Sequence, residues 1–532
     1  MSLQVQALSY IHPNKDILFQ NISFSISASD KCVIVGNNGI GKSTLLKIIV
    51  GQLTPATGQV LCDESPYMIP QHFGQFDTRT VAEALGIADK IKSLSVILDG
   101  QGTDQDFRLL NDDWDIQERL SEALTRWHID YITPDMVMGT LSGGEKTKVF
   151  LAGMNMYQPS LVLMDEPTNH LDAKGRALLY EFIRQANCTM LIVSHDRTLL
   201  NMLPAVYEMS SEGMQFYPMS YSEYKKTVEA ETTAKVTRLH NQQKELAKAE
   251  KSARKTMERQ QKHASRGEKQ SAKKCVARIA MGNLRNKSES STSRLNKVQQ
   301  DKLQAINQEV QEIRASIAEY VAIKINIESS VLPSCKRLVQ VTNVTFTYND
   351  RSTLWQQFPI HLTIRSGDRI WLQGDNGCGK STLLKLIAGI LQPTSGEVLR
   401  SSSLNILYLD QEYSFLNSEL TVYGQLETCH SKKPEHELKM LLNRFLFDAS
   451  TWDKKCGSLS GGERMKLALC WLLICENTPD LIIVDEPTNN IDLSSMDILA
   501  DTLRSYKGTL LVVSHDEQFV QDVGTEQVVR IA

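Results

Sequence analysis

The sequence predicts an α/β protein made of two copies of one domain, separated by a long helical hairpin. Three observations support this fold class. Four sequence motifs occur in the same order in both halves of the 532-residue chain. Short apolar runs lead into these motifs, which is typical of buried parallel strands. The segment between the halves has no proline from residue 219 to 332 and is rich in Lys, Glu, Gln and Ala, which favours helix.

The four motifs define the repeat and the domain boundaries. GNNGIGKSTLLK at 36–47 recurs as GDNGCGKSTLLK at 374–385, and LSGGEKTK at 141–148 recurs as LSGGERMK at 459–466. LVLMDEPTNHLD at 161–172 recurs as LIIVDEPTNNID at 481–492, and LIVSHD at 191–196 as LVVSHD at 511–516. Four repeated motifs in one order indicate a duplicated domain. We therefore expect one domain at 1–220, a linker at 221–332 and a second domain at 333–532.

The first half carries an insertion. Gln71 lies 71 residues before Ser142, whereas Gln411 lies 49 residues before Ser460. About 22 extra residues therefore fall near 89–129. Loops absorb extra length at small cost, so a surface insertion without a role would be tolerated there.

The linker shows the spacing of an antiparallel coiled coil. Its second part steps by three and four residues through an apolar seam: Leu303, Ile306, Val310, Ile313, Ile317 and Tyr320. Its first part fits the same register at Val236, Leu239, Leu246, Ala253 and Met257. Turn-forming residues at 282–293 separate the two parts, so we expect a hairpin with a polar, basic tip at 281–294.

Charge is distributed unevenly along the chain. Residues 231–300 hold 18 Lys and Arg but only 6 Asp and Glu, whereas the whole chain has a net charge of −4. A basic segment on an acidic body favours an anionic partner such as RNA, although a solvated coiled coil explains the same composition.

No run approaches the roughly 18 apolar residues of a membrane span. The N-terminus lacks a signal-peptide layout, and the ten scattered cysteines form no CxxC pair, so we expect reduced thiols in a cytoplasmic protein.

Each repeat carries a phosphate-binding loop between an apolar strand and a Leu-rich helix. The pattern GxxxxGK[ST] lets backbone N–H groups surround phosphates at a helix N-terminus. Lys42 and Lys380 would pair with the β- and γ-phosphates of ATP, and Ser43 and Ser381 with Mg²⁺. The other loop residues assigned to ATP are Gly36, Asn37, Asn38, Gly39, Gly41 and Thr44 in the first repeat, and Gly374, Asp375, Asn376, Gly377, Gly379 and Thr382 in the second.

Paired acidic residues follow a second apolar strand in each repeat. Asp165 and Asp485 suit a hydrogen bond to Mg²⁺-bound water. Glu166 and Glu486 suit polarisation of the attacking water. His195 and His515 end a further apolar strand and would contact the γ-phosphate; a structural role is common for such a histidine, but its duplicated SHD context favours the catalytic one.

The motifs LSGGE, DEPTN and SHD after a phosphate loop resemble the ATP-binding cassette family, and the resemblance covers both halves. It implies two P-loop cassette domains in which the LSGGE motif of one covers the ATP held by the other, with Asp172 and Asp492 at the D-loop positions. One site would combine Lys42, Ser43, Gln71, Asp165, Glu166 and His195 with Ser460, Gly461 and Gly462. The second would combine Lys380, Ser381, Gln411, Asp485, Glu486 and His515 with Ser142, Gly143 and Gly144. The implied Mg²⁺ residues are Ser43, Gln71, Asp165, Ser381, Gln411 and Asp485. Both sites have every catalytic group, so we expect both to hydrolyse ATP.

An aromatic residue near the start of each cassette stacks on adenine in this family. Tyr10 and Tyr348 are the candidates, although an ungapped alignment of the halves sets His12 opposite Tyr348.

Two fused cassettes joined by a basic helical hairpin resemble the ABC-F subfamily, and YPMSYSEY at 217–224 is similar to the tyrosine-rich start of its linkers. The resemblance implies a ribosome partner (ribosomal RNA and, at the exit site, tRNA), with the insertion as a short arm and with an intramolecular cassette dimer in a monomer. Candidate RNA contacts are Lys262, Arg266, Lys269, Lys273, Lys274, Arg278, Arg285 and Lys287. ATP binding would then favour the ribosome-bound state, and hydrolysis would release the protein.

Several alternatives stay open from the sequence. Relief of stalled translation and protection against antibiotics fit equally well. A transporter ATPase would need a membrane subunit, and a DNA-associated cassette protein normally carries a far longer coiled coil. The second repeat departs from the subfamily at Asn490 and Ile491, where PTNNID replaces PTNHLD, so the sequence assigns no role to His170.

Overall fold

The computed structural model describes residues 2–13, 15–210, 213–271, 304, 306–311, 335–348, 353–375, 377–429, 433–445, 447–475, 478–488 and 491–531. The chain divides into two compact units. One contains Met1–Tyr221 and Ile323–Ala532, that is, both repeats, and the other contains Ser222–Ala322. Each unit is considered by itself.

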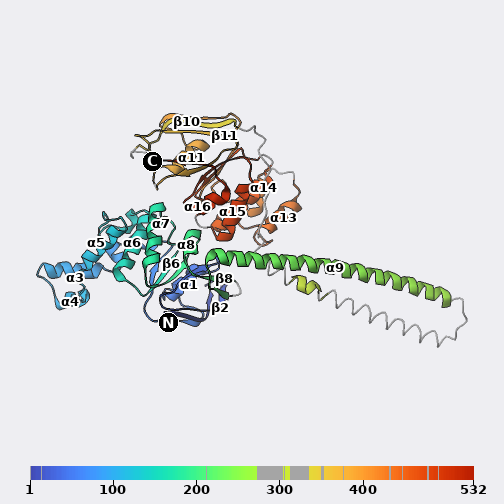
Figure 1. Cartoon of the computed structure of the whole chain (residues 1–532), viewed down its shortest axis with the longest axis horizontal. Helices are drawn as coiled ribbons and strands as arrows, with labels where there is room; N and C mark the ends of the chain where they lie inside the picture. The colour runs from blue at the N-terminus through green and yellow to red at the C-terminus, as the bar shows by residue number, and fades with distance from the viewer. Residues whose placement is uncertain are drawn as a thin grey trace. The chain divides into compact units, whose positions relative to one another are not determined.

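The first repeat has a small antiparallel sheet and a larger, mostly parallel one (Figure 1). The small sheet has the order β2-β1-β4 and is built from β1 (Leu3–Ile11), β2 (Ile17–Ile26) and β4 (Thr57–Cys62). The larger sheet has the order β5-β6-β7-β3-β8-β9: Tyr67–Ile69, Leu161–Asp165, Thr189–Val193, Lys31–Val35, Ala205–Ser210 and Gly213–Tyr217. The helices of the first repeat include α1 (Lys42–Ile49), α6 (Gly143–Tyr157), α7 (Ala173–Gln185) and α8 (Arg197–Met202).

The second repeat has the same plan, which confirms the predicted duplicated α/β fold. Its small sheet is β11-β10-β13: Ile360–Arg365, Arg337–Thr345 and Ser395–Arg400. Its larger sheet is β14-β15-β16-β12-β17: Ile406–Leu409, Leu481–Asp485, Thr509–Val513, Arg369–Gln373 and Gln527–Arg530. Its helices include α11 (Lys380–Ala388), α14 (Gly461–Ile474), α15 (Leu493–Ser505) and α16 (Glu517–Val523).

Burial explains why the site-bearing strands are so apolar. All five residues of β6, LVLMD, and all five of β15, LIIVD, are buried. β3, β6 and β7 pair in parallel, as do β12, β15 and β16. Loops after parallel strands meet at one edge of the sheet, so the topology gathers the phosphate loop, the acidic pair and the histidine there.

The insertion of the first repeat consists of two helices. α2 (Val81–Ala84) and α5 (Ile116–Arg126) have counterparts in α12 (Val422–Glu427) and α13 (Glu435–Arg444), at matching distances from the shared motifs. The extra residues therefore form α3 (Ala88–Leu98) and α4 (Asp104–Leu110), which project together in Figure 1. This places the insertion in the first part of the predicted interval.

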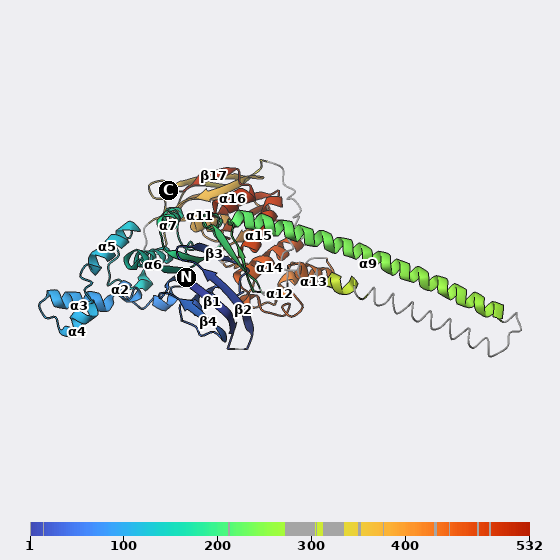
Figure 2. The ribbon, with the colours of Figure 1, turned by 60° about the horizontal axis from the view of Figure 1, so that its bottom comes forward.

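The second unit is dominated by one helix, α9 (Tyr221–Ser271), which is 51 residues long (Figure 2). Arg238 of α9 pairs with Glu309 at 2.8 Å, and Val310 is buried, so the returning part of the linker packs beside α9 at this level. Leu239 and Leu246 are partly buried, as the seam predicts, but Val236 is 44% exposed. The predicted tip at 281–294 lies outside the described residues.

Among the residues that the structure describes, no helix combines the length and the apolar character that crossing a membrane requires. The long helix α9 is strongly polar along its whole course.

Candidate nucleotide-binding sites

The two phosphate-loop lysines are held inside their own loops. Lys42 Nζ donates to the carbonyls of Gly36 at 2.6 Å and Asn37 at 3.1 Å. Lys380 Nζ donates to the carbonyls of Gly374 at 2.9 Å and Asp375 at 3.1 Å. Both side chains are buried, so each ammonium sits at the centre of a loop of backbone dipoles, where phosphate oxygens would replace the carbonyls as partners.

Glycine is required immediately before each of these lysines. Gly41 has φ 105° and Gly379 has φ 95°, a left-handed conformation that other residues rarely adopt. A Cβ at Gly41 would lie 2.8 Å from Phe19, and one at Gly379 would lie 2.6 Å from Trp355. Backbone conformation and close packing thus both explain this glycine of the motif.

The two aspartates have the surroundings expected of a Mg²⁺ site. The Ser43 hydroxyl lies close enough to Asp165, and the Ser381 hydroxyl to Asp485, to lower the pKa of each aspartate, which brings together the two residue types assigned to the ion. In the described part of the chain, the second oxygen Oδ1 of each aspartate is buried and makes no hydrogen bond. Burial raises the pKa of both carboxyls. A hydroxyl beside a buried carboxylate oxygen suits a hard divalent cation, so these residues fit Mg²⁺.

Each glutamate is turned into the site by an unusual backbone. Glu166 has φ 50° and Glu486 has φ 48°. For a residue other than glycine, this left-handed conformation costs on the order of 1–3 kcal/mol and is concentrated at functional sites. A hydrogen bond from the Glu166 amide to Val193 (2.8 Å), and one from the Glu486 amide to Val513 (2.9 Å), fixes each turn.

The histidines meet the glutamates in both repeats. The His195 amide donates to Glu166 Oε2 at 3.1 Å, and its ring atom Nε2 lies 3.2 Å from Oε1. The corresponding distances between His515 and Glu486 are both 3.3 Å. The structure therefore brings each predicted glutamate and histidine together.

Burial changes the protonation of these pairs. It raises the pKa of Glu166 to about 8, with a further rise from Asp165 that Lys42 opposes. It raises the pKa of Glu486 to about 7, against the charges of Lys380 and Arg176. Burial lowers the pKa of His195 to about 3 and that of His515 to about 4, so both imidazoles are neutral at pH 7. A carboxylate with a raised pKa is a better proton acceptor.

A cavity of about 390 Å³ opens over the first phosphate loop. Its lining includes Asn38, Gly39, Gly41, Lys42, Ser43, Thr44, Gln71, Asp165, Glu166 and His195, together with His12, Leu18, Asn169 and Val193. Tyr10 is not among them: its ring packs against His12 and Phe19, at 5.6 and 6.2 Å between centroids. His12 is thus the ring at the cavity, and only the ungapped alignment with Tyr348 pointed to it.

In the second repeat, Tyr348 lies by the phosphate loop, with its hydroxyl 3.0 Å from Thr382 Oγ1. Tyr408 donates to Asp485 Oδ2 at 2.9 Å, a contact that the sequence did not predict. Met68 stands at the corresponding place in the first repeat, so Asp165 has no such partner from this position. Gln411 is exposed two residues after β14, and Asn376 lies outside the described residues.

The LSGGE motifs are helix N-termini. The Ser142 hydroxyl accepts from the Glu145 amide at 3.3 Å, and Glu145 accepts from the Ser142 amide at 2.7 Å. Ser460 and Glu463 repeat this capping box at the start of α14, at the same two distances. A Cβ at Gly143 or Gly144 would meet His170, at 3.0 Å from its ring or 2.7 Å from its carbonyl. His170, to which the sequence assigned no role, therefore packs on the motif of its own repeat.

Residues of the two repeats meet at the first site. The Asn38 amide lies 3.4 Å from Asp492 Oδ2, across a sequence distance of 454 residues. A Cβ at Gly462 would lie 3.9 Å from that aspartate and 4.0 Å from Asn38 Nδ2. The first phosphate loop and the second LSGGE motif, which belong to one predicted set, thus lie together, and the second D-loop lies beside them.

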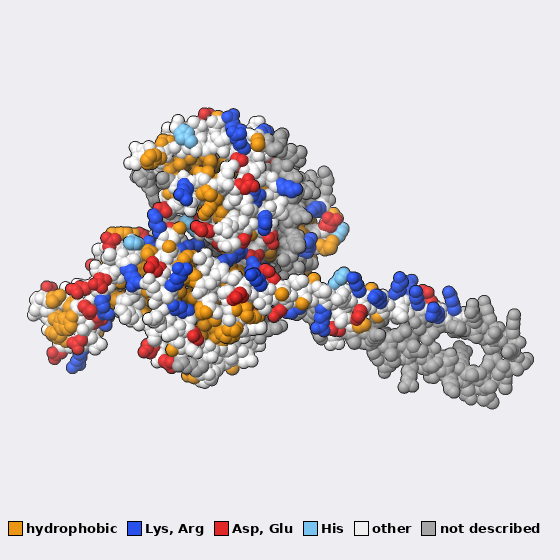
Figure 3. Space-filling view, viewed as in Figure 1, with side chains coloured by type: hydrophobic (Ala, Val, Ile, Leu, Met, Phe, Trp, Pro, Cys, Tyr) orange, Lys and Arg blue, Asp and Glu red, His pale blue; other side chains and the backbone are white. Residues whose placement is uncertain are grey.

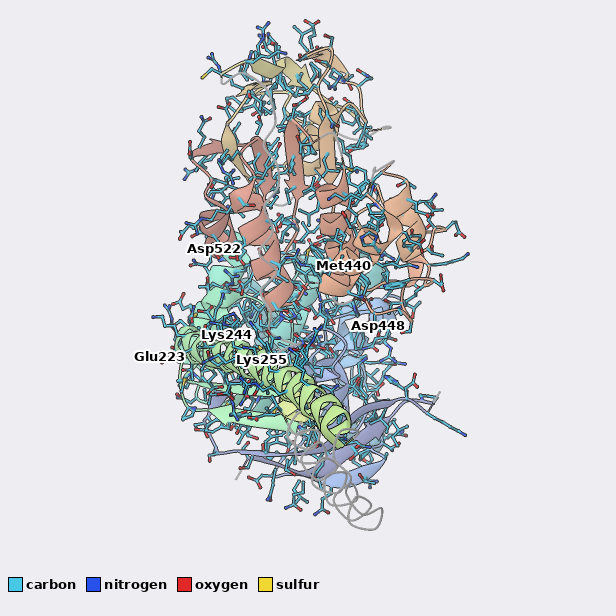
Figure 4. All side chains as sticks on the ribbon, turned by 90° about the vertical axis from the view of Figure 1, so that its right-hand side faces the viewer. Glu223, Lys244, Lys255, Met440, Asp448 and Asp522 are labelled. Carbon is cyan, nitrogen blue, oxygen red and sulfur yellow. The ribbon has the colours of Figure 1, made fainter. Side chains whose placement is uncertain are left out.

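Cationic side chains of the first repeat reach the second. Lys174 pairs with Asp375 at 3.0 Å, and Arg176 donates to the His515 carbonyl at 3.3 Å. Arg197 is 7% exposed and pairs with both Asp497 and Asp522 (Asp522 is labelled in Figure 4). No sequence pattern predicted these contacts, because they join positions about 200 to 340 residues apart.

Few of the RNA-contact candidates lie in the described part of the linker. Lys262 is exposed, Arg266 and Lys269 belong to α9, and Lys273, Lys274, Arg278, Arg285 and Lys287 lie outside the described residues. Figure 3 shows blue side chains along α9, and Figure 4 labels two of them. The exposed cations of this helix include Lys244, Lys248, Lys251, Lys255 and Arg259.

The two inserted helices have a different surface. Leu98, Phe107 and Trp114 are 71%, 48% and 47% exposed. Figure 3 shows an orange area around α3 and α4. The exposed acidic residues of the same segment, 88–118, are Asp89, Asp99, Asp104, Asp112, Asp115 and Glu118, and its exposed cations are Lys92 and Arg108. This surface is apolar and acidic, the opposite of α9.

Comparison with known proteins agrees with this geometry. A family model described as "ABC transporter" matches residues 19–169 and 358–489, one segment in each repeat. "ABC transporter F family member 5" of Arabidopsis thaliana is 29% identical over 95% of this chain and 72% of its own length. "Ribosome protection protein VmlR" of Bacillus subtilis is 29% identical over 96% of this chain and 84% of its own. Among solved structures, that of the archaeal ribosome recycling factor aABCE1 with stalk protein aP1 has a TM-score of 0.58 at 18% identity, covering 98% of this chain and 87% of that one.

The last of these likenesses shows the fold alone. The family model and the near full-length relatives show more, because they cover both repeats and the motifs that build the sites. ABC cassettes bind and hydrolyse ATP, as the arrangement of lysine, aspartate and glutamate here allows. The chain is a twin-cassette member of the ABC transporter family, with the ABC-F proteins as its relatives over nearly its whole length.

Proposed function

We propose that this protein is a cytoplasmic ATPase that binds the ribosome while two ATP molecules hold its cassettes together, and that hydrolysis releases it. Its output is a change in translation, either relief of stalled ribosomes or protection against antibiotics. Each ATP would lie between the phosphate loop of one cassette and the LSGGE motif of the other.

One observation carries the composite-site part of the proposal. The Asn38 amide of the first cassette lies 3.4 Å from the D-loop carboxylate of Asp492, with Gly462 beside it. A ligand that contacts both loops therefore bridges the cassettes, and its binding free energy favours the arrangement in which they meet.

The residues of each site divide the chemistry between them. Lys42 and Lys380 would bind the phosphates, and Ser43 and Asp165, like Ser381 and Asp485, would hold Mg²⁺. Bound Mg²⁺ would neutralise charge on the transferred phosphoryl group. Glu166 and Glu486 would orient the attacking water and accept its proton, while the neutral histidines hold each glutamate in place. Orientation of this kind accounts for much of the barrier reduction in phosphoryl transfer.

The ribosome part rests on charge and on relatives. α9 presents a row of exposed Lys and Arg side chains, which suits RNA phosphates through counterion release. One relative over most of the chain is a ribosome protection protein, and we extend that partner to this chain. The acidic, apolar surface of α3 and α4 would repel RNA, so we assign it to a protein component instead.

The double variant Glu166→Gln/Glu486→Gln tests the proposal, because it should bind ATP without hydrolysing it. In a sucrose gradient of cell lysate with ATP, we expect this variant to migrate with ribosomes. The matched control is Lys42→Ala/Lys380→Ala, which should lose ATP binding and stay at the top. If the trapped variant also stays at the top, or follows membranes, the ribosome proposal is wrong.

The linker is tested in the same gradient. Lys244→Gln/Lys255→Gln removes two exposed cations of α9, and should weaken ribosome binding and reduce its dependence on salt. Lys336→Gln/Lys507→Gln removes two exposed cations of the cassettes and serves as the control of equal charge. If both double variants lose ribosome binding to the same extent, net charge explains the loss, and a specific role for the linker is contradicted.

A further inference from the structure

Arg176 of the first cassette is a largely buried cation that reaches the second site. It lies on α7, four residues after the D-loop aspartate Asp172, and its side chain is 12% exposed. Nη1 donates to the carbonyl of His515 at 3.3 Å, across 339 residues of sequence. The arrangement thus adds to the second site a group that belongs to neither its phosphate loop nor an LSGGE motif.

The guanidinium is fixed from its own cassette. Nε donates to the Leu171 carbonyl at 3.2 Å, and Nη1 lies 3.6 Å from Asp196 Oδ2. That carboxylate also accepts from the Tyr180 hydroxyl at 2.5 Å. Arg176 is therefore anchored to the D-loop and the histidine loop of the first cassette, and can hold the His515 backbone against them.

Arg176 bonds to His515, and His515 in turn positions the catalytic glutamate Glu486. The His515 amide donates to Glu486 Oε2 at 3.3 Å, and its ring Nε2 lies 3.3 Å from Oε1. A shift of the His515 backbone would therefore move both contacts to Glu486. Misplacement of a reacting group by about 1 Å can cost on the order of a hundredfold in rate.

Among the described residues, the first site has no counterpart of the hydrogen bond between Arg176 and the His515 carbonyl. The repeat offset of 320 residues places Met496 at the position of Arg176. A thioether has no N–H to donate, so the histidine loop of the first site receives no such bond from this position. The two sites therefore differ in a residue supplied by the opposite cassette, although all their motif residues match.

We propose that Arg176 is a positioning residue, supplied in trans, that orients the His515–Glu486 pair and makes hydrolysis at the second site depend on the first cassette. The inference rests on the proposed function, in that it requires each composite site to hydrolyse ATP.

Single-turnover chemical quench with ATP tests the proposal site by site. Glu166→Gln leaves only the second site active, and Glu486→Gln leaves only the first. Arg176→Met, which copies the residue of the first site, should slow ADP formation about tenfold or more in the Glu166→Gln chain, since a charge-assisted hydrogen bond is lost. In the Glu486→Gln chain it should leave the rate unchanged.

Two further variants separate positioning from general damage. Arg176→Lys keeps the cation and should restore part of the rate at the second site. Arg184→Met removes an exposed arginine from the same helix and should leave both rates unchanged. In the Glu166→Gln/Glu486→Gln chain, Arg176→Met should bind ATP as tightly as its parent, because the arginine acts on the glutamate rather than on nucleotide affinity.

Equal slowing at both sites, an unchanged rate at the second site, or a tenfold loss of ATP affinity would overturn the inference. If the Glu166→Gln parent itself forms no ADP, the second site is not an ATPase, and both the proposed function and this inference are wrong. That outcome is seen in the parent, before Arg176 is substituted, and so differs from a failure of the inference alone.

Discussion

Arg197 is the residue whose loss should most weaken the contact between the cassettes. Its side chain is 7% exposed, and its guanidinium pairs with Asp497 of α15 and Asp522 of α16, whose side chains are 34% and 35% exposed. Burial alone would lower the pKa of this arginine, but the two carboxylates outweigh it and raise the pKa. The charge is therefore retained at the interface because both aspartates are there.

The free energy that Arg197→Ala removes from the contact between the cassettes follows from these exposed fractions. Removing one partner of a fully buried ion pair costs about 3–5 kcal/mol, whereas an exposed pair contributes about 0–1 kcal/mol. Here the arginine is buried and water still reaches the aspartates, so we expect about 2 kcal/mol. That is a factor of roughly 30 in the equilibrium between joined and separated cassettes.

The assay is ATP binding by the Glu166→Gln/Glu486→Gln chain, followed with a fluorescent ATP analogue. If ATP binds between joined cassettes, Arg197→Ala should raise the half-saturating concentration roughly 30-fold. Asp522→Asn should raise it by a smaller factor, since Asp497 stays. Arg504→Ala removes an exposed arginine of α15 and should have no effect. An unchanged half-saturation in correctly folded Arg197→Ala would refute the reasoning.

Three further predictions concern local features. Ser142→Ala should lower the stability of the first cassette by about 1 kcal/mol, measured by thermal unfolding, because the hydroxyl caps α6; equal stability would show that the cap contributes nothing. Gly41→Ala should cost about 2 kcal/mol and weaken ATP binding at the first site, because its φ is 105° and its Cβ would lie 2.8 Å from Phe19; calorimetry would check both effects. For Asp113, burial raises the pKa, but Lys90 and Arg119 outweigh it and lower the pKa below its ordinary value of about 4. The stabilisation of α3–α5 by Asp113 should thus be full at neutral pH and disappear as pH falls through that lowered pKa. Backbone amides of α3–α5 should exchange hydrogen faster in Asp113→Asn than in the parent at pH 7, and at the same rate in acid.

Much of the candidate site was predictable because its residues are close in sequence. The lysine, serine and glycines of each phosphate loop form one continuous motif, and the backbone demands that select them, such as φ 105° at Gly41, act within a few residues. Each acidic pair begins at the last residue of a five-residue strand that is buried throughout, so the four apolar residues before the aspartate mark where the strand ends. The capping boxes of LSGGE are equally local, because their partners are three residues apart.

The left-handed backbone of Glu166 and Glu486 was not predictable from residue type, since glutamate does not favour it. The strand pairing around each glutamate imposes that conformation, through bonds to Val193 and Val513. Packing also decided which ring lies at the cavity: the Tyr10 ring packs against Phe19, and His12 lines the cavity. β1 has register irregularities at Tyr10 and ends at Ile11, so strand alternation does not fix the direction of either ring.

The duplication, the cassette fold and the motif residues of both sites can be predicted from the amino-acid sequence, because each depends on short-range pattern and backbone geometry. Which cationic side chains cross between the cassettes depends on tertiary packing. Arg176 and Arg197 look like ordinary helix residues in the sequence, and their partners lie 300 or more positions away. The repeats match at every motif, yet Met496 and Glu517 stand where the first cassette has these arginines. Contacts between distant segments depend on the packed surfaces of both, and no local pattern encodes them.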